Sequence, residues 1–350
     1  MTQTPPGMIE GPAAWRSSDL APGEWIHDLQ TAEIAEIEDA ARSLAASGRD
    51  LVETTADQFP LPRLAPRLSA VLRSEVLDGR GFAVLRGLDP TALSRRESAA
   101  AFVGLGAHLG AVRPQNAAGH VLGHVKDLGR SSGDPTARLY QTHERQTYHT
   151  DSCDVVALMC LQPARAGGLS SLVSSVTLHN EMRRLRPDLA QLLFEPIETD
   201  RRGEVADGQR PWFNIPVFNW HAGCFAGIYQ RQYIESARRF PEVAPLSATQ
   251  VEALDLLDRL AEDPALHLQI EFHPGDIQLV NNHVLFHDRT AFEDWPEPER
   301  RRHLLRLWLA PLGAQPLAEV FAERFGSVIP GERGGVSVPR TKWVAPLDAA

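Results

Sequence analysis

Apolar residues recur at helical spacing in three segments of the first third of the chain. These are residues 31–47 ("TAEIAEIEDAARSLAAS"), residues 64–79 ("LAPRLSAVLRSEVLDG") and residues 94–110 ("SRRESAAAFVGLGAHLG"). Each pattern predicts a helix with one buried face, and Thr31 is a candidate cap for the first. Residues 81–88, "GFAVLRGL", form an apolar run suited to a buried strand. We therefore expect helices that cover a sheet.

Beyond residue 148 the pattern becomes typical of strands. The runs "VVALMCLQ" (155–162) and "LSSLVSS" (169–175) each predict a strand. In "LQIEFHPGDIQLVNNHVLFHDRTAF" (268–292) we expect two short strands around a Pro-Gly-Asp turn, and "RRHLLRLWLA" (301–310) predicts a final core strand.

Helical patterns separate these strands. A helical insert is expected from near Val176 toward Leu193. The segment "LSATQVEALDLLDRLAED" (246–263) predicts a further helix, because Ser247 and Gln250 have the spacing of a capping box before an apolar stripe.

The order of elements predicts the fold class. Strands scattered from residue 82 to residue 309, with a helix-rich insert at about 176–265, favour a mainly β fold with surrounding helices. A double-stranded β-helix, the jelly-roll or cupin-like core, suits this order better than an alternating α/β sheet. We expect one domain at residues 26–350, preceded by an N-terminal arm at residues 1–25.

Composition narrows the range of functions. The chain has 350 residues, 43% of them hydrophobic, which is enough to bury a full core. A formal net charge of −10 argues against nucleic acid or an anionic membrane as a partner. Three cysteines without CxxC spacing argue against a disulfide framework, and no run approaches the roughly 20 apolar residues that span a bilayer. We expect a cytoplasmic protein with a small-molecule substrate, and the sequence leaves open whether it forms a homo-oligomer.

The stretch "TYHTDSCDVVALMC", residues 147–160, carries the first chemical signal. It places His149 and Asp151 two residues apart at the edge of an apolar run. On a strand or at its end, both side chains of an H-x-D triplet point to one face and can bind one metal ion. Two imidazoles and one carboxylate leave three octahedral positions open, which ferrous iron needs to hold a co-substrate and O2 together. By itself, the triplet is equally well explained as a hydrogen-bonded loop pair.

A second match to the same pattern argues for caution. His179 and Glu181 in "TLHNEMRRL" also stand two residues apart. They lie in a predicted helix, where side chains at this spacing diverge, so we expect both on the solvated surface.

The third ligand would come from "NNHVLFHDRTAF", residues 281–292, where His283 and His287 are both candidates. At this point the chain resembles a known family. The motifs "YHTD", "GGLSSLVSS", "PGDIQLVNNHVLFHDRTAFED" and "RRHLLRLWL", in this order, are similar to those of the taurine dioxygenase-like (TauD/TfdA) family of iron(II)- and 2-oxoglutarate-dependent dioxygenases. The resemblance covers residues 80–315 and rests on four ordered motifs.

The resemblance implies that His149, Asp151 and His287 bind iron(II). His287 matches the histidine before the family's "R-T-A-F"-like turn, and His283 then becomes a neighbouring histidine with a hydrogen bond in the core. The helical insert fits between Asp151 and His287, because a long insertion adds little loop-closure entropy.

The resemblance also implies an anchor for 2-oxoglutarate. The family holds the distal carboxylate with an arginine after the second histidine, and Arg302 is the aligned residue. A planar guanidinium binds a carboxylate in a bidentate manner, although residues 300–302 also fit a solvated basic run. Arg306, on the same face of a strand, matches a substrate-side arginine. Ser170, with Ser171 as the alternative, matches a hydroxyl that assists the 2-oxoglutarate carboxylate.

Substrate contacts are less sharply indicated. Residues 111–147 are polar and rich in glycine, which is typical of a lid over an active site. Candidates are Gln115, Asn116, His120 and His124 in this segment, and Trp212, Phe213, Asn214 and Trp220 in "PWFNIPVFNWH". Most aromatic residues of this kind belong to the core. An arginine at position 306 favours an anionic substrate.

With these residues, the resemblance implies hydroxylation of an unactivated C–H bond, with 2-oxoglutarate and O2 converted to succinate and CO2. Because Asp151 is a carboxylate, no ligand position is left for a halide, so we do not expect halogenation. The alternatives are an amino-acid or biosynthetic-intermediate hydroxylase or desaturase of the same superfamily, a zinc hydrolase, and a metal-free binding barrel. A binding barrel has no need for two histidines, an aspartate and a second anion anchor.

Overall fold

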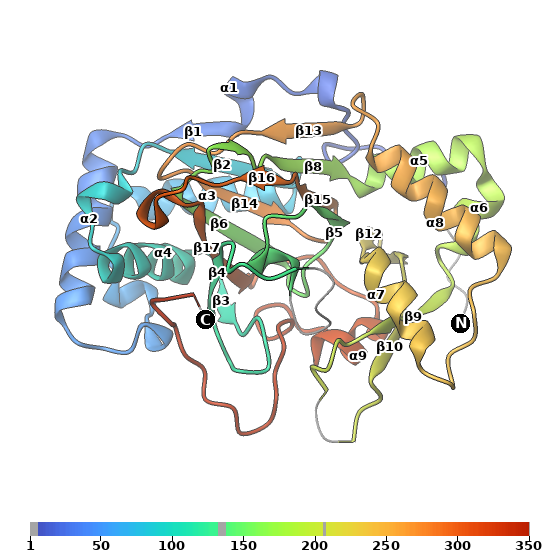
Figure 1. Cartoon of the computed structure of the whole chain (residues 1–350). Coiled ribbons are helices and arrows are strands. Elements are labelled where there is room, and N and C mark those ends of the chain that lie inside the picture. The colour runs from blue at the N-terminus through green and yellow to red at the C-terminus, as the bar shows by residue number, and fades with distance from the viewer. Residues whose placement is uncertain (1–5, 132–137, 206–207, 350) are drawn as a thin grey trace.

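Two sheets that share one hydrophobic core form the centre of the molecule (Figure 1). A computed structural model describes residues 6–131, 138–205 and 208–349. Within them the larger sheet contains, in order, β1 (Ile26–Asp28), β2 (Phe82–Arg86), β14 (Ile277–Asn281), β6 (Val155–Gln162), β17 (His303–Ala310) and β3 (Ala111–Arg113), with β4 (Leu122–Val125) also paired to β17. The smaller sheet contains, in order, β13 (His267–Ile270), β8 (Ser170–Ser174), β15 (Leu285–Arg289) and β5 (Gln146–His149).

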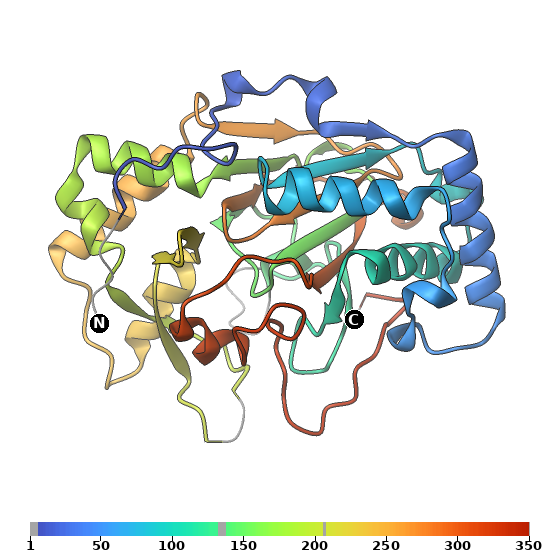
Figure 2. The ribbon, with the colours of Figure 1, turned by 180° about the vertical axis from the view of Figure 1, so that it is seen from behind.

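Helices cover the outer face of the larger sheet (Figure 2). They are α2 (Thr31–Ala46), α3 (Leu64–Val71), its π-helical continuation Leu72–Leu77, and α4 (Arg95–Leu109). The predicted helices and the predicted strand at β2 are therefore confirmed. The cap of α2 is Gln30 and not Thr31, because the Gln30 backbone N–H donates to Glu33 Oε2 at 2.8 Å.

Strand β17 shows how the sequence pattern positions the site. Leu305, Leu307 and Leu309 pack against the covering helices, in one hydrophobic cluster with them. Because successive side chains of a strand alternate between faces, Arg306 and Trp308 point the other way, toward the smaller sheet. An arginine on the inner face of a buried strand needs polar partners there.

The expected helix-rich insert also contains strands. Its helices are α5 (Ser175–Leu185), α6 (Pro187–Leu192), α7 (Arg231–Ser236) and α8 (Ala248–Ala261), and its strand pairs are β9 (Pro196–Asp200) with β10 (Trp212–Pro216) and β11 (Phe218–His221) with β12 (Cys224–Gly227). The capping box of α8 is confirmed, because the Gln250 N–H donates to Ser247 Oγ at 3.2 Å and the Ser247 N–H to Gln250 Oε1 at 2.9 Å.

Short elements complete the described chain. They are α1 (Pro22–Trp25), the pair β7 (Ala166–Gly167) and β16 (Phe292–Glu293), α9 (Ala322–Phe325), and the 3-10 helices Ser17–Asp19, Leu51–Glu53, Ala56–Gln58, Pro90–Ala92, Leu139–Gln141, Ala237–Arg239, Pro298–Arg300 and Glu319–Phe321. In the expected N-terminal arm, Trp15 and Trp25 pack on Phe82 with ring centroids 5.7 and 5.8 Å away.

Two expectations need revision. Residues 111–147 are not a loop throughout, because they contain β3 and β4, which pair with β17, and the first half of β5. Residues 268–292 contain parts of four strands, β13, β14, β15 and β16, instead of two. The predicted second strand is divided, because β14 pairs with β2 and β6 in the larger sheet and β15 pairs with β8 in the smaller one. No helix among the described residues is long and apolar enough to cross a membrane.

Candidate active site

His149 and His287 face each other on neighbouring strands of the smaller sheet. His149 ends β5, His287 lies in β15, and the two residues are direct cross-strand partners. Their ring centroids are 4.2 Å apart, and His287 Nε2 lies 3.9 Å from Asp151 Oδ2. One ligand atom from each of the three residues lies within 4.8 Å of the others. The structure thus brings together the three residues that the sequence named as metal ligands.

The larger sheet fixes the carboxylate of this cluster. Asp151 Oδ2 accepts a hydrogen bond from Trp308 Nε1 at 2.9 Å, and Arg306 Nη1 lies 3.2 Å from the same oxygen. The backbone N–H of Asp151 donates to Asn282 Oδ1 at 3.0 Å. Residues of β17 and of the turn after β14 therefore hold the carboxylate beside the two histidines.

The surroundings of the two imidazoles indicate which ring nitrogens carry a lone pair that could bind a metal. His149 Nδ1 lies 2.8 Å from the Thr147 carbonyl oxygen, to which it donates its proton. His149 Nε2 then carries the lone pair and accepts from the Gln146 side-chain amide at 2.8 Å. The buried His287 Nδ1 has no hydrogen-bond partner within the part of the chain that the structure describes. A carbonyl that fixes the tautomer of a ligating histidine is a common feature of metal sites.

Burial and local charge set the protonation states that a metal requires. Burial lowers the pKa of His149, and burial and the facing His149 lower the pKa of His287 to about 3. Burial alone would raise the pKa of Asp151, but Arg306, the two histidines and the Trp308 N–H outweigh it and lower this pKa. Two neutral imidazoles and one carboxylate are the donor set of a facial iron(II) site. The residues present therefore fit a ferrous ion.

A small cavity of about 40 Å³ adjoins the cluster, and Arg302 lines it from the position before β17. Arg302 is only 3% exposed, and its Nη1 has no hydrogen-bond partner among the described residues. Burial lowers the pKa of this guanidinium to about 10. A buried cation without a bound anion is costly, so the arrangement invites an anionic ligand.

The two serines of the "GGLSS" segment have different environments. Ser170 lines the small cavity, and its Oγ donates to Gln278 Oε1 at 3.0 Å. The Ser171 hydroxyl is instead paired with the Tyr148 hydroxyl at 2.6 Å. Of the two candidates, only Ser170 is therefore within the lining.

Sequence reasoning missed a second arginine in this cavity. Arg289 is 6% exposed, and its Nε and Nη1 have no hydrogen-bond partner among the described residues. Burial and the neighbouring Arg302 lower its pKa to about 9. Both guanidinium groups lie over the Phe292 ring, at 4.9 Å for Arg289 and 5.1 Å for Arg302. The available signal was spacing, because Arg289 follows His287 by two residues and so shares its face of β15.

Arg306 lies between the small cavity and a larger one, since it lines both. Its Nε donates to Gln115 Oε1 at 2.7 Å, and its Nη1 faces Asp151. The guanidinium lies 4.9 Å from the centre of the Tyr140 ring. The structure therefore places this predicted substrate-side residue directly beside the metal-ligand cluster.

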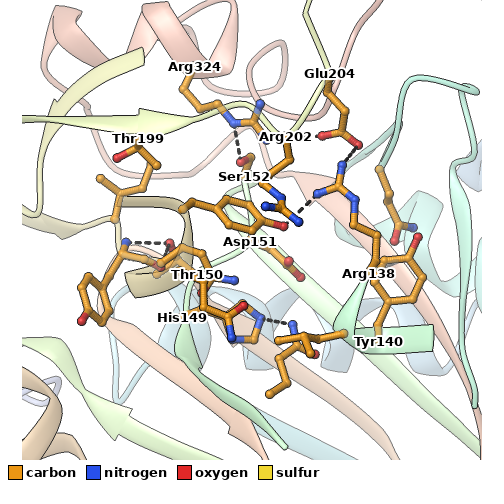
Figure 3. A pocket seen from close by; sticks show the side chains of 18 of the residues that line it. Arg138, Tyr140, His149, Thr150, Asp151, Ser152, Thr199, Arg202, Glu204 and Arg324 are labelled. Atoms are coloured by element: carbon orange, nitrogen blue, oxygen red, sulfur yellow. Dashed lines mark hydrogen bonds and ion pairs between the residues drawn. The ribbon is translucent and has the colours of Figure 1, made fainter. Parts of the chain in front are cut away.

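The larger cavity has a volume of about 350 Å³ and opens from the same cluster (Figure 3). Of the predicted substrate contacts, Gln115 and Phe213 line it. The other predicted contacts lie outside its lining: Asn116, His120, His124, Trp212, Asn214 and Trp220. His124 is instead buried against His303, with 2.8 Å between His124 Nδ1 and His303 Nε2.

The larger cavity also contains charged residues that the sequence did not indicate. Arg138, Arg202, Glu204 and Arg324 line it, and no spacing rule connects these positions. They meet because the segment before the 3-10 helix Leu139–Gln141, the insert and the C-terminal segment all contribute to the lining of this cavity.

The second H-x-E match was placed wrongly on the surface. His179 is fully buried among Phe194, Phe218 and Phe225, with ring centroids 5.5 to 5.8 Å away. Glu181 is also buried and pairs with Arg184 at 2.7 Å. Helix α5 packs on α6 and α8, so its inner face includes both residues. Neither belongs to the metal-ligand cluster.

His283 is a core residue, as expected. It is 2% exposed, and its Nε2 lies 2.7 Å from Asp154 Oδ1. Arg333 Nε donates to the same oxygen at 2.8 Å, so this aspartate connects two buried side chains.

Comparison with solved structures identifies the fold. Asparagine oxygenase in complex with Fe(II), 2S,3S-3-hydroxyasparagine and succinate has a TM-score of 0.63 at 18% identity, covering 81% of this chain and 93% of that one. The non-heme iron oxygenase OrfP in complex with Fe and alpha-ketoglutaric acid has a TM-score of 0.61 at 15% identity, covering 81% and 93%. The fold of mixed sheets and helices is thus that of non-haem iron oxygenases.

Sequence comparison then identifies the family. The model of the taurine catabolism dioxygenase TauD, TfdA family matches residues 44–308, so this chain belongs to that family of 2-oxoglutarate-dependent dioxygenases. FR-33289 synthase of Streptomyces rubellomurinus is 30% identical over 311 residues, 86% of this chain and 90% of that protein. Taurine hydroxylase-like protein SAT17 of Stachybotrys chartarum is 31% identical over 316 residues, which cover 86% of this chain and 79% of that protein. Uridine-5'-phosphate dioxygenase of a Streptomyces species is 28% identical over 175 residues, which cover 48% of this chain and 62% of that protein. The resemblance seen in the motifs is confirmed.

Proposed function

We propose that this dioxygenase hydroxylates an unactivated C–H bond of a small anionic substrate and that its site consists of the residues described above. One observation carries the proposal. A largely buried His-Asp-His cluster adjoins a cavity in which two arginines have N–H groups without partners among the described residues. A zinc hydrolase or a metal-free barrel has no need for such a second cavity.

The metal would be held by His149, Asp151 and His287, whose protonation states suit iron(II). When bound, iron and 2-oxoglutarate supply the oxidising chemistry, in which 2-oxoglutarate and O2 give succinate and CO2 and one oxygen atom enters the substrate. Because Asp151 occupies the third protein position, the residues favour hydroxylation and leave no protein vacancy for a halide.

The distal carboxylate of 2-oxoglutarate would lie between Arg302 and Arg289. Two buried guanidinium groups can donate several charge-assisted hydrogen bonds to one carboxylate. The negative charge of that carboxylate would offset the free-energy cost of burying the two cations. Ser170 lines the same cavity and is the proposed hydroxyl partner. The apolar side chains of Val156, Leu158 and Leu304 complete the wall and exclude water.

Arg306 is proposed to serve the substrate side. Its guanidinium keeps the Asp151 carboxylate ionised and oriented, and its position on both cavities lets it contact a substrate anion. Comparison supports a small substrate with polar groups. Two structural neighbours are named with hydroxyasparagine and (3S)-hydroxy-L-Arg, and one relative is named for uridine 5'-phosphate.

We also propose that the larger and smaller sheets are the two halves of a double-stranded β-helix. Its support is the shared core, to which β2, β6, β14 and β17 contribute from one sheet and β5, β8, β13 and β15 from the other. Residues 26–350 would then form one domain.

The experiment is an anaerobic titration of the apo-protein with Fe(II) and then with 2-oxoglutarate, followed by visible absorption. Wild type should develop the weak charge-transfer band of the chelate and, after O2 is admitted, form succinate. The band should be lost in His149→Ala and should require much more 2-oxoglutarate in Arg302→Leu.

Arg300→Leu is the matched control, because Arg300 is only two residues from Arg302 in sequence but 50% exposed and absent from both cavity linings. It should behave as wild type. An unchanged band in His149→Ala would remove that residue from the site, and an absent band in wild type would contradict the proposed function.

A further inference from the structure

The loop that follows Asp151 contacts a segment from the far end of the chain. This segment, residues 315–336, comes after the last core strand β17 and includes the 3-10 helix Glu319–Phe321 and helix α9, which lies beside β10 (Figure 1). It begins beyond residue 308, where the region matched by the family model ends. We call it the C-terminal support, and we call residues 152–154, which it contacts, the ligand loop.

Ser152, the first residue of the ligand loop, is bonded to the C-terminal support through its side chain and its backbone. Arg324 Nε donates to Ser152 Oγ at 2.8 Å (Figure 3), and the Gly335 N–H donates to the Ser152 carbonyl oxygen at 2.7 Å. Gly334 has a φ of +86°, and a Cβ atom on it would lie 3.0 Å from the same carbonyl oxygen. Glycine therefore allows the support to approach the loop this closely.

A buried ion pair fixes the other end of the ligand loop. The side chains of Arg333 and Asp154 are 0% and 1% exposed, and Arg333 Nε donates to Asp154 Oδ1 at 2.8 Å. Arg333 Nη1 and Nη2 donate to the carbonyl oxygens of Val328 and Gln315 at 2.9 and 2.7 Å. One guanidinium group thus joins the ligand loop to two further points of the C-terminal support.

The C-terminal support also packs on the turn after β14. The rings of Phe325 and His283 have centroids 5.9 Å apart, and His283 Nε2 lies 2.7 Å from Asp154 Oδ1. The preceding residue, Asn282, accepts the Asp151 N–H at its Oδ1, and its own N–H donates to the Asp154 carbonyl oxygen, both at 3.0 Å. The support therefore holds the turn that in turn holds the backbone of Asp151.

We propose that the C-terminal support positions Asp151 for the metal ion and that Arg333 is its main positioning residue. Trp308 and Arg306 hold the Asp151 carboxylate, whereas its backbone is held through Asn282 and the ligand loop. Metal–ligand distances vary by only about 0.2 Å, so a small shift of the loop would take this carboxylate out of reach of the ion. The inference rests on the proposed function, in which Asp151 is a ligand.

The alternative is that these contacts only stabilise the fold. Replacing Arg333 would then lower the free energy of unfolding, because a buried carboxylate loses a charge partner, and would leave the metal affinity of the folded protein unchanged. Under our inference the folded variant itself binds metal more weakly. Replacing groups that orient metal ligands typically changes metal affinity by about 10- to 100-fold.

The test is calorimetric titration of the metal-free full chain with Co(II), which accepts histidine and carboxylate ligands as iron(II) does. Wild type should bind Co(II), and His149→Ala should lose this binding, which assigns the signal to the proposed site. Arg333→Gln should bind Co(II) about tenfold or more weakly than wild type. Arg333→Lys keeps a charge for Asp154 but cannot also reach both carbonyl oxygens, so its affinity should lie between the two.

Ser152→Ala is a second, milder variant for the case that Arg333→Gln does not fold. It removes only the hydroxyl that accepts from Arg324, and it should weaken Co(II) binding by about threefold or more. Thermal melting of each variant verifies folding.

The matched control is Arg67→Gln. Arg67 lies in α3, on the outer face of the larger sheet, where its Nη1 donates to the buried Glu33 at 2.8 Å and its Nη2 to the Asp28 carbonyl oxygen at 3.0 Å. Like Arg333, it joins a buried carboxylate to a backbone carbonyl. Arg67→Gln should lower the melting temperature and bind Co(II) as wild type does.

Equal Co(II) affinity in wild type, Arg333→Lys and Ser152→Ala would overturn the inference. An equal loss of affinity in Arg67→Gln would also overturn it, because the effect would then follow general destabilisation. In both cases loss of binding in His149→Ala leaves the proposed function standing. A wild type that binds no Co(II), or that binds it as well after His149→Ala, would contradict the proposed function and the inference with it.

Discussion

Arg302 and Arg289 differ from many exposed arginines of the described chain, because neither guanidinium lies within ion-pair distance of a carboxylate. Within the described residues neither forms an ion pair, and both are buried beside Phe292. Arg302→Leu and Arg289→Leu should each raise the KM for 2-oxoglutarate by about 10- to 100-fold, because a hydrogen bond to a charged group contributes about 1.5–3 kcal/mol. The measurement is succinate formation against 2-oxoglutarate concentration. An unchanged KM in Arg289→Leu would show that Arg302 alone is the anchor.

Asp151 has a structural role in addition to its proposed role as a ligand. It is the charge partner of the buried Arg306 and accepts from Trp308. Asp151→Ala should abolish iron binding and also lower the free energy of unfolding by about 3 kcal/mol, since it leaves a buried cation unpaired. Trp308→Phe is the comparison, because it removes only a hydrogen bond, about 1 kcal/mol. Urea denaturation with and without Fe(II) checks both parts, and retained iron binding in Asp151→Ala would exclude it as a ligand.

Individual residues were predictable where a local rule applied. His149 and Asp151 share a face by strand spacing, and motif order brought in His287 and Arg302. Arg138, Glu204 and Arg324 could not be found, because they come from three segments distant in sequence and their contact depends on tertiary folding. The predicted surface position of His179 was wrong for a related reason. The helix that carries it packs its inner face against aromatic residues of the insert, and the sequence pattern did not show this contact.

At the scale of elements, helix α4 depends on a close contact with the segment before α3. A Cβ atom on Gly104 would lie 2.3 Å from ring atoms of Phe59, which is fully buried. Gly104→Ala should therefore destabilise the protein by about 1–3 kcal/mol through overpacking, although alanine is about 1 kcal/mol better than glycine inside a helix. Thermal unfolding measures the effect.

Gly23→Ala is the control for that substitution. Gly23 lies in helix α1, and a Cβ atom there would meet nothing within 4 Å. The melting temperature of the Gly23→Ala variant should be equal to or above that of wild type. Destabilisation by both substitutions to the same degree would refute a steric explanation at Gly104.

Elements with regular periodicity were predicted well, as α2, α4, α8 and β17 illustrate. Each of these elements buries one face, so its apolar residues recur at the spacing of its own secondary structure and reveal it from the local sequence. Short strands such as β3, β4 and β9 were missed, because three to five residues in a polar context carry almost no periodic signal and obtain their structure from pairing. The partition of residues 268–292 between two sheets also depends on tertiary pairing.

For the whole molecule, buried neutral histidines make stability depend on pH. Burial lowers the pKa of His179 to about 4, below the unfolded value of about 6.5. Between these values the unfolded chain binds more protons, so stability is fully present above about pH 6.5 and is lost as pH falls toward 4, by roughly 1.4 kcal/mol per pH unit. His179→Phe should reduce the loss of stability between pH 7.5 and 5 by about 2 kcal/mol, as judged by urea denaturation. An identical pH profile in the variant would contradict this assignment.

The position of Arg306 has a consequence for the thermodynamics of the entire enzyme. Its guanidinium contacts Asp151 and borders both cavities. A substrate anion that pairs with Arg306 would therefore also change the electrostatic potential at Asp151, the proposed metal ligand. By linkage, whatever factor the substrate applies to the affinity for iron and 2-oxoglutarate, these ligands apply in return to the affinity for the substrate. The coupling between the two sites then depends on one side chain. Substitution of Arg306 should weaken the binding of substrate and the binding of iron with 2-oxoglutarate, and should also make the two affinities independent of each other.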